Sequence, residues 1–105
     1  MSRSVCLLLA LLAIAPSVLA ADAIVVSQHN RKFWPATMDL PKGGVIRIVN
    51  DDRVTHHVYV DASGMSYDSG EMPVGTSLTL EFDHEGVFPV RCAIHPTMHL
   101  DVTVH

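Results

Sequence analysis

Short runs of apolar and β-branched residues recur along the chain, separated by clusters of Gly, Pro, Asp and Asn. After residue 20 no run keeps the three-to-four-residue spacing of an amphipathic helix, so the pattern predicts an all-β chain. Residues 61–75 are rich in turn formers, and we expect them to form the longest and most mobile connection. Seven short strands, the number typical of a β-sandwich, are predicted over residues 23–28, 37–40, 45–50, 56–61, 77–82, 87–92 and 100–104.

Apolar and polar residues alternate within several of these runs. Ile46 and Ile48 alternate with Arg47, and Leu78 alternates with Thr79. Successive side chains on a strand point to opposite faces of the sheet. We therefore expect one face of each sheet to be apolar and to pack into a core.

The N-terminal segment has the layout of a secretory signal peptide. Arg3 precedes an uncharged apolar run that ends in small residues at Ala20, and this run is too short to anchor the chain in a bilayer. We expect cleavage after Ala20, with Ala23 as a second choice. The predicted organisation is thus a signal peptide over residues 1–20 and one domain over residues 21–105, secreted or periplasmic and not membrane-spanning.

Charge and cysteine content narrow the function further. The expected exported chain has six basic and eleven acidic residues, a net charge of −5 with His neutral, which argues against a nucleic-acid partner. Cys6 would leave with the signal peptide, so Cys92 would remain alone and no intramolecular disulfide could form. A lone cysteine in an oxidising compartment is buried and inert, bonded to another chain, or used in chemistry such as metal ligation.

A candidate metal-binding motif follows the sixth predicted strand. Cys92, His95 and Met98 stand at C-x-x-H-x-x-M spacing in the turn between two strands, where three side chains can converge on one ion. Thiolate, thioether and imidazole together favour copper, whereas zinc more usually recruits a second cysteine or a carboxylate. The alternatives are an ordinary buried thiol for Cys92 and core packing for Met98.

A further ligand is expected from a second loop. His56 and His57 stand at the start of a predicted strand, after a polar turn led by Asn50. Because neighbouring residues on a strand point to opposite faces, only one of these two imidazoles can face the ion. The residues alone leave the choice open.

These features together resemble the cupredoxin family, and the loop from Cys92 to Met98 most resembles that of its plastocyanin- and amicyanin-like members. The resemblance covers nearly the whole exported chain and includes Phe33-Trp34-Pro35, the turn from Lys42 to Val45, Asn50, His56 and Gly86. It implies a single cupredoxin-like Greek-key β-sandwich that carries one type 1 copper ion, cycling between Cu(I) and Cu(II). The ligands that it implies are His56, Cys92, His95 and Met98.

The function implied by this resemblance is electron transport rather than catalysis. A monomeric one-electron carrier would exchange electrons with a redox protein such as a cytochrome or a dehydrogenase. We expect the exposed edge of His95 to be the exit, with Ile94 and Pro96 as a small apolar docking patch. The net negative charge predicts a basic partner.

Three residues depart from the family pattern. His57 stands where the family usually has an Asn that ties the two ligand loops together, which predicts a looser site. Val90 and Ile94 replace an aromatic residue and a proline that are common near the ligands. Because groups around the ligands tune a metal site, these changes predict altered colour and potential, including a tetragonal, greener site.

Three other functions are weaker alternatives. Copper storage, delivery or resistance would use the seven histidines as additional weak sites, with Met65 and Met72 assisting Cu(I) capture. For the main copper site, we expect His57 and His99 to lie outside the ligand set. A mononuclear copper enzyme would need an open coordination position, which four ligands in so short a chain disfavour. Nucleophilic catalysis by Cys92 and His95 lacks an evident orienting acid.

Overall fold

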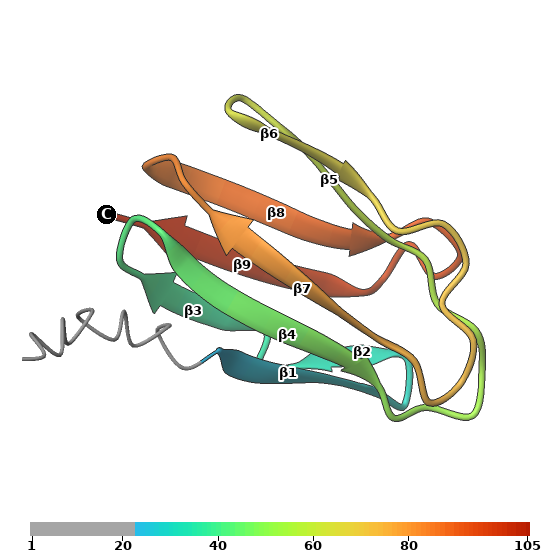
Figure 1. The fold of residues 1–105 in the computed structure, drawn as a ribbon. Coiled ribbons are helices and arrows are strands. Elements are labelled where there is room, and N and C mark those ends of the chain that lie inside the picture. The colour runs from blue at the N-terminus through green and yellow to red at the C-terminus, as the bar shows by residue number, and fades with distance from the viewer. Residues whose placement is uncertain (1–22) are drawn as a thin grey trace, which may run out of the picture.

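The computed structural model describes residues 23–105, and the expected signal peptide lies outside them. These residues form nine strands in two facing sheets, with no helix among them (Figure 1). The first sheet has the order β2-β1-β4-β7, formed by Lys32–Trp34, Ile24–His29, Gly44–Asn50 and Ser77–Phe82. The second has the order β3-β9-β8-β5-β6, formed by Thr37–Leu40, His99–Val104, Gly86–Cys92, Val58–Ala62 and Met65–Asp68.

The expected all-β sandwich is confirmed, and its strand pairing is mixed. β1 runs parallel to β4 and β3 runs parallel to β9, while the other strand pairs are antiparallel. No helix within residues 23–105 is long and apolar enough to cross a membrane.

Two strands were missed in the sequence, and one begins later than expected. β2 is only three residues long and follows a tight turn in which Asn30 and Arg31 have positive φ angles of 50° and 54°. β6 lies inside the turn-rich segment 61–75 and pairs with β5 at the edge of its sheet. The expected strand 56–61 starts at Val58, because His56 makes only an isolated bridge.

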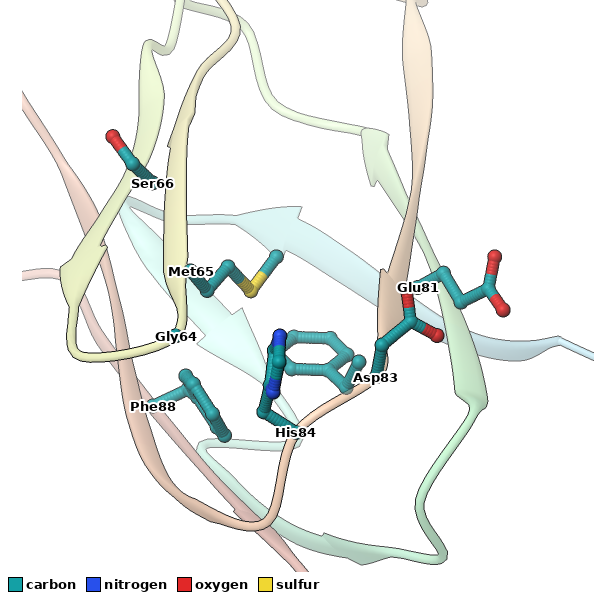
Figure 2. A pocket seen from close by; sticks show the side chains of 8 residues that line it. Gly64, Met65, Ser66, Glu81, Asp83, His84 and Phe88 are labelled. Atoms are coloured by element: carbon teal, nitrogen blue, oxygen red, sulfur yellow. The ribbon is translucent and has the colours of Figure 1, made fainter.

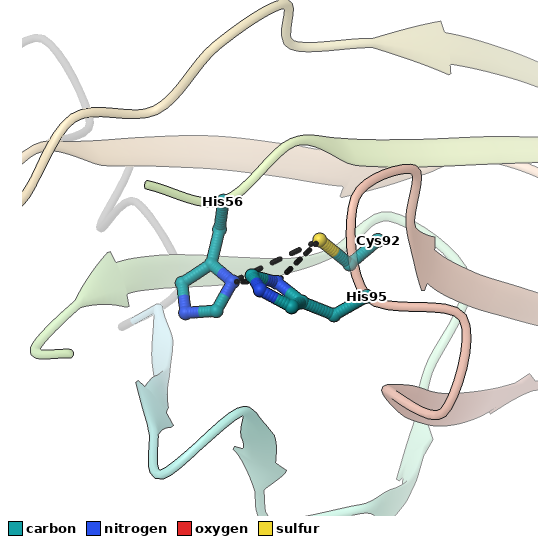
Figure 3. Close-up of side chains that lie close together, drawn as sticks. All are labelled: His56, Cys92 and His95. Carbon is teal, nitrogen blue, oxygen red and sulfur yellow. Dashed lines mark hydrogen bonds between the residues drawn. The ribbon is translucent and has the colours of Figure 1, made fainter. Parts of the chain in front are cut away.

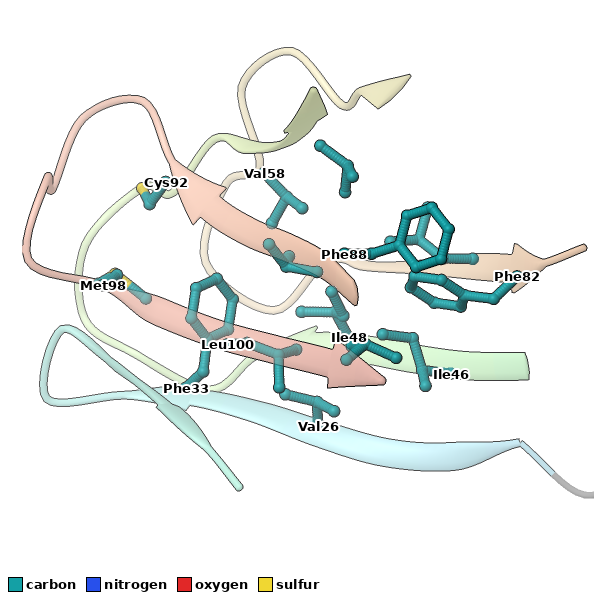
Figure 4. Close-up of a cluster of buried hydrophobic side chains, with 14 of the residues drawn as sticks. Val26, Phe33, Ile46, Ile48, Val58, Phe82, Phe88, Cys92, Met98 and Leu100 are labelled. Atoms are coloured by element: carbon teal, nitrogen blue, oxygen red, sulfur yellow. The ribbon is translucent and has the colours of Figure 1, made fainter. Parts of the chain in front are cut away.

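The alternating strands build one core between the sheets. Ile46 and Ile48 are fully buried on β4, while Arg47 between them is exposed, as the alternation predicted. Three phenylalanines from β2, β7 and β8 fill the space between the layers (Figure 4). Each such side chain contributes roughly 1.5–3 kcal/mol through burial, so this core is the main source of stability.

The two ends of the sandwich carry different loops (Figure 1). One end, called the site end below, carries the β1–β2, β4–β5, β6–β7 and β8–β9 connections. The opposite end, called the distal end, carries the β3–β4, β5–β6 and β7–β8 turns. Cys92 closes β8 at the site end, and Met98 immediately precedes β9 there (Figure 4).

Candidate metal centre

Three of the four predicted ligands meet at the site end. His56 Nδ1 lies 3.1 Å from His95 Nδ1, and Cys92 Sγ lies 3.8 Å and 3.7 Å from these two nitrogens (Figure 3). Within residues 23–105, this is the group of at least three His, Cys, Asp or Glu side chains whose donor atoms come within 4.8 Å of one another. Two segments 36 residues apart in sequence therefore supply one donor set.

The spacing of these donors fits a single ion. Zinc shows metal–nitrogen bonds of roughly 2.0–2.1 Å and metal–sulfur bonds of roughly 2.3 Å. With bond angles of roughly 100–120°, such bonds place two nitrogens about 3.1–3.6 Å apart, and a nitrogen and a sulfur about 3.3–3.8 Å apart. The observed separations of 3.1, 3.7 and 3.8 Å match this arrangement. Two imidazoles and one thiolate in a trigonal set are the donors of a blue-copper site, so the group can hold one copper ion.

Backbone pairing fixes the position of His56. Its N–H donates to the carbonyl of Met72 at 3.1 Å and its carbonyl accepts from Met72 N–H at 2.7 Å. The Asn50 side chain locks this bridge, because its Nδ2 donates to the carbonyls of Met72 and Val54 at 2.9 and 3.0 Å. His56 is fully buried as a result.

Asp52 orients the His56 ring, and it was missed in the sequence. His56 Nε2–H donates to Asp52 Oδ2 at 2.9 Å, which leaves the Nδ1 lone pair facing Cys92. Burial raises the pKa of Asp52, but N–H groups of Arg31 and Arg53 and the His56 ring outweigh it and lower this pKa to about 2. The signal was an aspartate four residues before a candidate ligand, inside a turn led by Asn50.

His95 is the more accessible of the two imidazoles. It is partly exposed, whereas His56 and Cys92 are buried. Burial lowers the pKa of His95, and the neighbouring His56 ring and Arg31 guanidinium lower it further against the opposing effect of Asp52. A lowered pKa keeps its nitrogen lone pair free at neutral pH, which is the form that binds metal.

The loop between Cys92 and Met98 is a tight turn. Met98 N–H donates to the carbonyl of His95 at 3.0 Å, which turns the chain back toward β9. The Met98 side chain is only 1% exposed and belongs to the core cluster at the site end (Figure 4). That Met98 also binds the metal ion stays a prediction.

His57 lies outside the donor group, as predicted. Its Nε2–H donates to Asp68 on β6 at 2.5 Å, and the pKa of Asp68 is lowered first by Gly70 N–H and then by His57. The two ligand loops are nevertheless joined through the backbone: His57 N–H donates to Cys92 Sγ at 3.4 Å and Ala93 N–H donates to His57 O at 2.8 Å. This tie does not depend on which side chain stands at position 57.

The other candidate copper-capturing histidines do not belong to the donor group. Met65 and His84 line a hollow of about 250 Å³ at the distal end, together with Glu81 and Asp83 (Figure 2). Met72 is buried in the core. The remaining histidines, exposed and spread over the chain, are His29, His99 and His105.

Several solved structures are similar to this fold. No protein-family model matches the sequence, and no curated protein matches it. Among solved structures, a purple cupredoxin from Nitrosopumilus maritimus has a TM-score of 0.69 and 25% identity over 80% of this chain and 100% of its own. A copper(I) form of an amicyanin variant has a TM-score of 0.73 and 24% identity over 83% of this chain and 87% of its own.

A larger protein contains the same architecture. A copper-containing nitrite reductase from Thermus scotoductus SA-01 has a TM-score of 0.74 and 22% identity over 83% of this chain, which spans 23% of that protein. The resemblance inferred from sequence is thus confirmed at the level of structure. The chain has the cupredoxin-like fold, with a His-Cys-His group at its site end that can hold one copper ion.

Proposed function

We propose that this chain is a mononuclear copper protein that passes single electrons between redox partners. The observation that carries the proposal is the meeting of one buried cysteine sulfur and two imidazole nitrogens within 3.1–3.8 Å. Met98 is proposed as a fourth, weak donor from the same loop, because it is buried at the site end. A copper ion bound there would supply a one-electron Cu(II)/Cu(I) couple that these ligands suit in both states.

The protein's own contribution is to keep the donors fixed. Asp52 holds the His56 ring, and Asn50 holds the loop that carries it. The His57 N–H holds the sulfur of Cys92. A site tied in this way changes little when one electron is added or removed, which keeps electron transfer fast. His95 alone among the three donors is partly exposed, so we propose its outer edge as the route to a partner.

Two rival functions are less consistent with this geometry. Storage or scavenging would be served by several accessible sites, but the exposed histidines lie outside the donor group, and Met65 begins β6 at the β5–β6 turn, at the opposite end of the sandwich (Figure 1). An enzyme would need an open coordination position, which Met98 as fourth donor would close. We propose that the protein is not an enzyme, that it acts after export directed by residues 1–20, and that it is a monomer.

The test is the visible spectrum of the purified protein during titration with Cu(II), followed by cycles of ascorbate reduction and reoxidation. We expect one equivalent to give an intense thiolate-to-copper band that bleaches and returns without release of the metal. Cys92→Ser should lose the band, while His84→Ala, which removes an exposed imidazole at the distal end, should keep it. Several weakly coloured equivalents, or copper released on reduction, would instead indicate copper handling.

A further inference from the structure

A second hollow adjoins the metal-binding loop at the site end. It has a volume of about 270 Å³ and lies where β2 meets the β8–β9 loop and the start of β9. Phe33 is buried at this hollow, and Trp34, 52% exposed, lines it. Its other residues are Lys32, Ala36, Thr97 and His99. Thr97 lies two residues from His95, so the hollow is next to the proposed electron exit.

The two segments that form this surface carry only positive charge. Residues 29–36 and 93–99 contain Arg31 and Lys32 and no Asp or Glu, although the whole chain is net negative. Lys32 Nζ lies 5.7 Å from the centre of the Trp34 ring. Arg31 lies beside the metal group, because its N–H donates to Asp52 Oδ2 at 2.8 Å and Asp52 in turn holds the His56 ring.

Three carboxylates near this surface are engaged. Asp101, whose N–H donates to the carbonyl of Ala36, is paired with Arg91 at 3.0 Å. Asp52 is buried and accepts hydrogen bonds from His56, from Arg31 N–H and from Arg53 N–H. Asp51 accepts a hydrogen bond from the Ser27 hydroxyl at 2.9 Å. The distal end, by contrast, carries Glu81, Asp83 and Glu85 on and beside the β7–β8 turn.

We propose that the hollow beside Trp34 docks a redox protein whose contact face carries carboxylates around a protruding apolar side chain. The apolar group would enter the hollow, and the carboxylates would face Arg31 and Lys32. This inference rests on the proposed function and specifies its partner. It replaces the basic partner that net charge alone predicted, because the charge beside the electron exit governs docking more than the total.

Charge separation also orients the encounter. An acidic partner is repelled by the carboxylates on and beside the β7–β8 turn, whereas the positive charges of Arg31 and Lys32 attract it to the hollow beside Trp34. Within a Debye length, roughly 10 Å at 0.1 M salt, this attraction is strong, and added salt weakens it. An exposed aromatic ring beside an apolar hollow then supplies the short-range contact.

The first experiment maps the surface with hexacyanochromate(III), a redox-inert paramagnetic trianion, on the reduced ¹⁵N-labelled protein. We expect the indole N–H of Trp34 and the amides of Lys32 and Thr97 to broaden first. Lys32→Glu should reduce this broadening at least about fivefold. Lys42→Glu, which makes the same charge change at the distal end, should leave the broadening unchanged. Broadening centred elsewhere, or equal effects of the two variants, would overturn the inference.

This first experiment reads the surface and does not depend on redox cycling. Its failure is therefore distinct from failure of the proposed function, which would show as absent or irreversible colour in the copper titration.

The second experiment measures electron transfer from the reduced protein to hexacyanoferrate(III), which takes one electron and becomes hexacyanoferrate(II). The rate should fall at least about threefold as salt rises from low ionic strength to about 0.2 M, although both reactants carry net negative charge. Lys32→Glu should slow the reaction more than Lys42→Glu. A rate that rises with salt in the unaltered protein would overturn the proposal.

Other occupants of the hollow are separated by two further measurements. Sedimentation should give a monomer for the protein and for Trp34→Ala, and a dimer lost in Trp34→Ala would assign the surface to a second copy. Vesicles containing phosphatidylglycerol should not retain the protein, and retention that Lys32→Glu abolishes would assign the surface to a membrane. Either result would replace the acidic redox partner.

Discussion

The two ends of the sandwich contain similar side chains, but within residues 23–105 only the site end brings them together as a metal group. At the distal end His84, Met65, Glu81 and Asp83 surround an open hollow (Figure 2). At the site end His56, Cys92 and His95 converge within 3.8 Å in a largely buried position (Figure 3). Residue type alone therefore does not make a metal site, because the backbone must also aim several donors at one point.

The carboxylates at the two ends show the same contrast. Three hydrogen-bond donors surround Asp52 and lower its pKa to about 2 in spite of its burial. At the distal end, the hydrogen bond and the negative charge of Asp83 raise the pKa of Glu81. The fold has therefore organised donors around the first carboxylate, whereas the second shares its surroundings with another acid.

The largest effect is expected from removing Asp52. Asp52→Ala leaves His56 Nε2–H and two backbone N–H groups without their acceptor, which should lower the free energy of unfolding by about 3 kcal/mol. Copper affinity should fall by about 10- to 100-fold, because the imidazole loses its orienting partner. Asp83→Ala at the distal end should change stability by less than about 0.5 kcal/mol. Urea unfolding measures the stability, and competition with a chelator measures the copper affinity. Similar losses in the two variants would refute the contrast between Asp52 and Asp83.

Acid should weaken the site end through the same carboxylate. The pKa of Asp52 is about 2 in the fold against an ordinary 3.8, so its stabilisation is complete above about pH 5 and lost as pH falls through 2. The difference corresponds to about 2 kcal/mol. Asp52→Asn should flatten the decline of metal-free unfolding free energy between pH 5 and pH 2. An equally steep decline in that variant would assign acid sensitivity to other groups.

Most of the fold could be predicted because it depends on local patterns. Alternation on β4, with Ile46 and Ile48 inward, and β-branched runs between turn formers predicted the strands that build the core. β2 and β6 were missed because their stability comes from pairing with β1 and β5, which a short polar sequence does not reveal. The pairing of Cys92 with His95 could be predicted because it is local: one tight turn places both residues.

The surroundings of the site could not be predicted from the sequence in the same way. Asp52 and Arg31 are 21 residues apart, and they meet only because β1 and β4 lie side by side. The choice between His56 and His57 depended on family resemblance, because strand alternation shows that they diverge but not which one faces Cys92. Long-range register decides such contacts, and a single sequence contains little information about it.

A smaller effect is expected from a methyl group placed on two glycines with positive φ. Gly64, at φ 88°, forms the β5–β6 turn, and an added Cβ would lie 3.2 Å from the Cβ and Cγ of His84. Gly70, at φ 65° near the site end, has open space around it. Gly64→Ala should cost about 1–2 kcal/mol and Gly70→Ala about 1 kcal/mol, because both suffer backbone strain but only the first also crowds a neighbour. Thermal unfolding ranks them, and the reverse order would contradict the packing of His84.

The smallest effect, and the sharpest comparison of the two ends, concerns thioethers. Met98→Leu and Met65→Leu make the same change at the site end and the distal end, and each should alter stability by less than about 1.5 kcal/mol because volume is conserved. If Met98 is the weak fourth donor, its loss should shift the visible spectrum and raise the reduction potential, since the more highly charged Cu(II) loses electron donation. Copper affinity should fall less than about tenfold, because the two imidazoles and the thiolate remain. Met65→Leu should leave spectrum, potential and affinity unchanged. Identical spectra and potentials for Met98→Leu and the unaltered protein would assign Met98 to core packing alone.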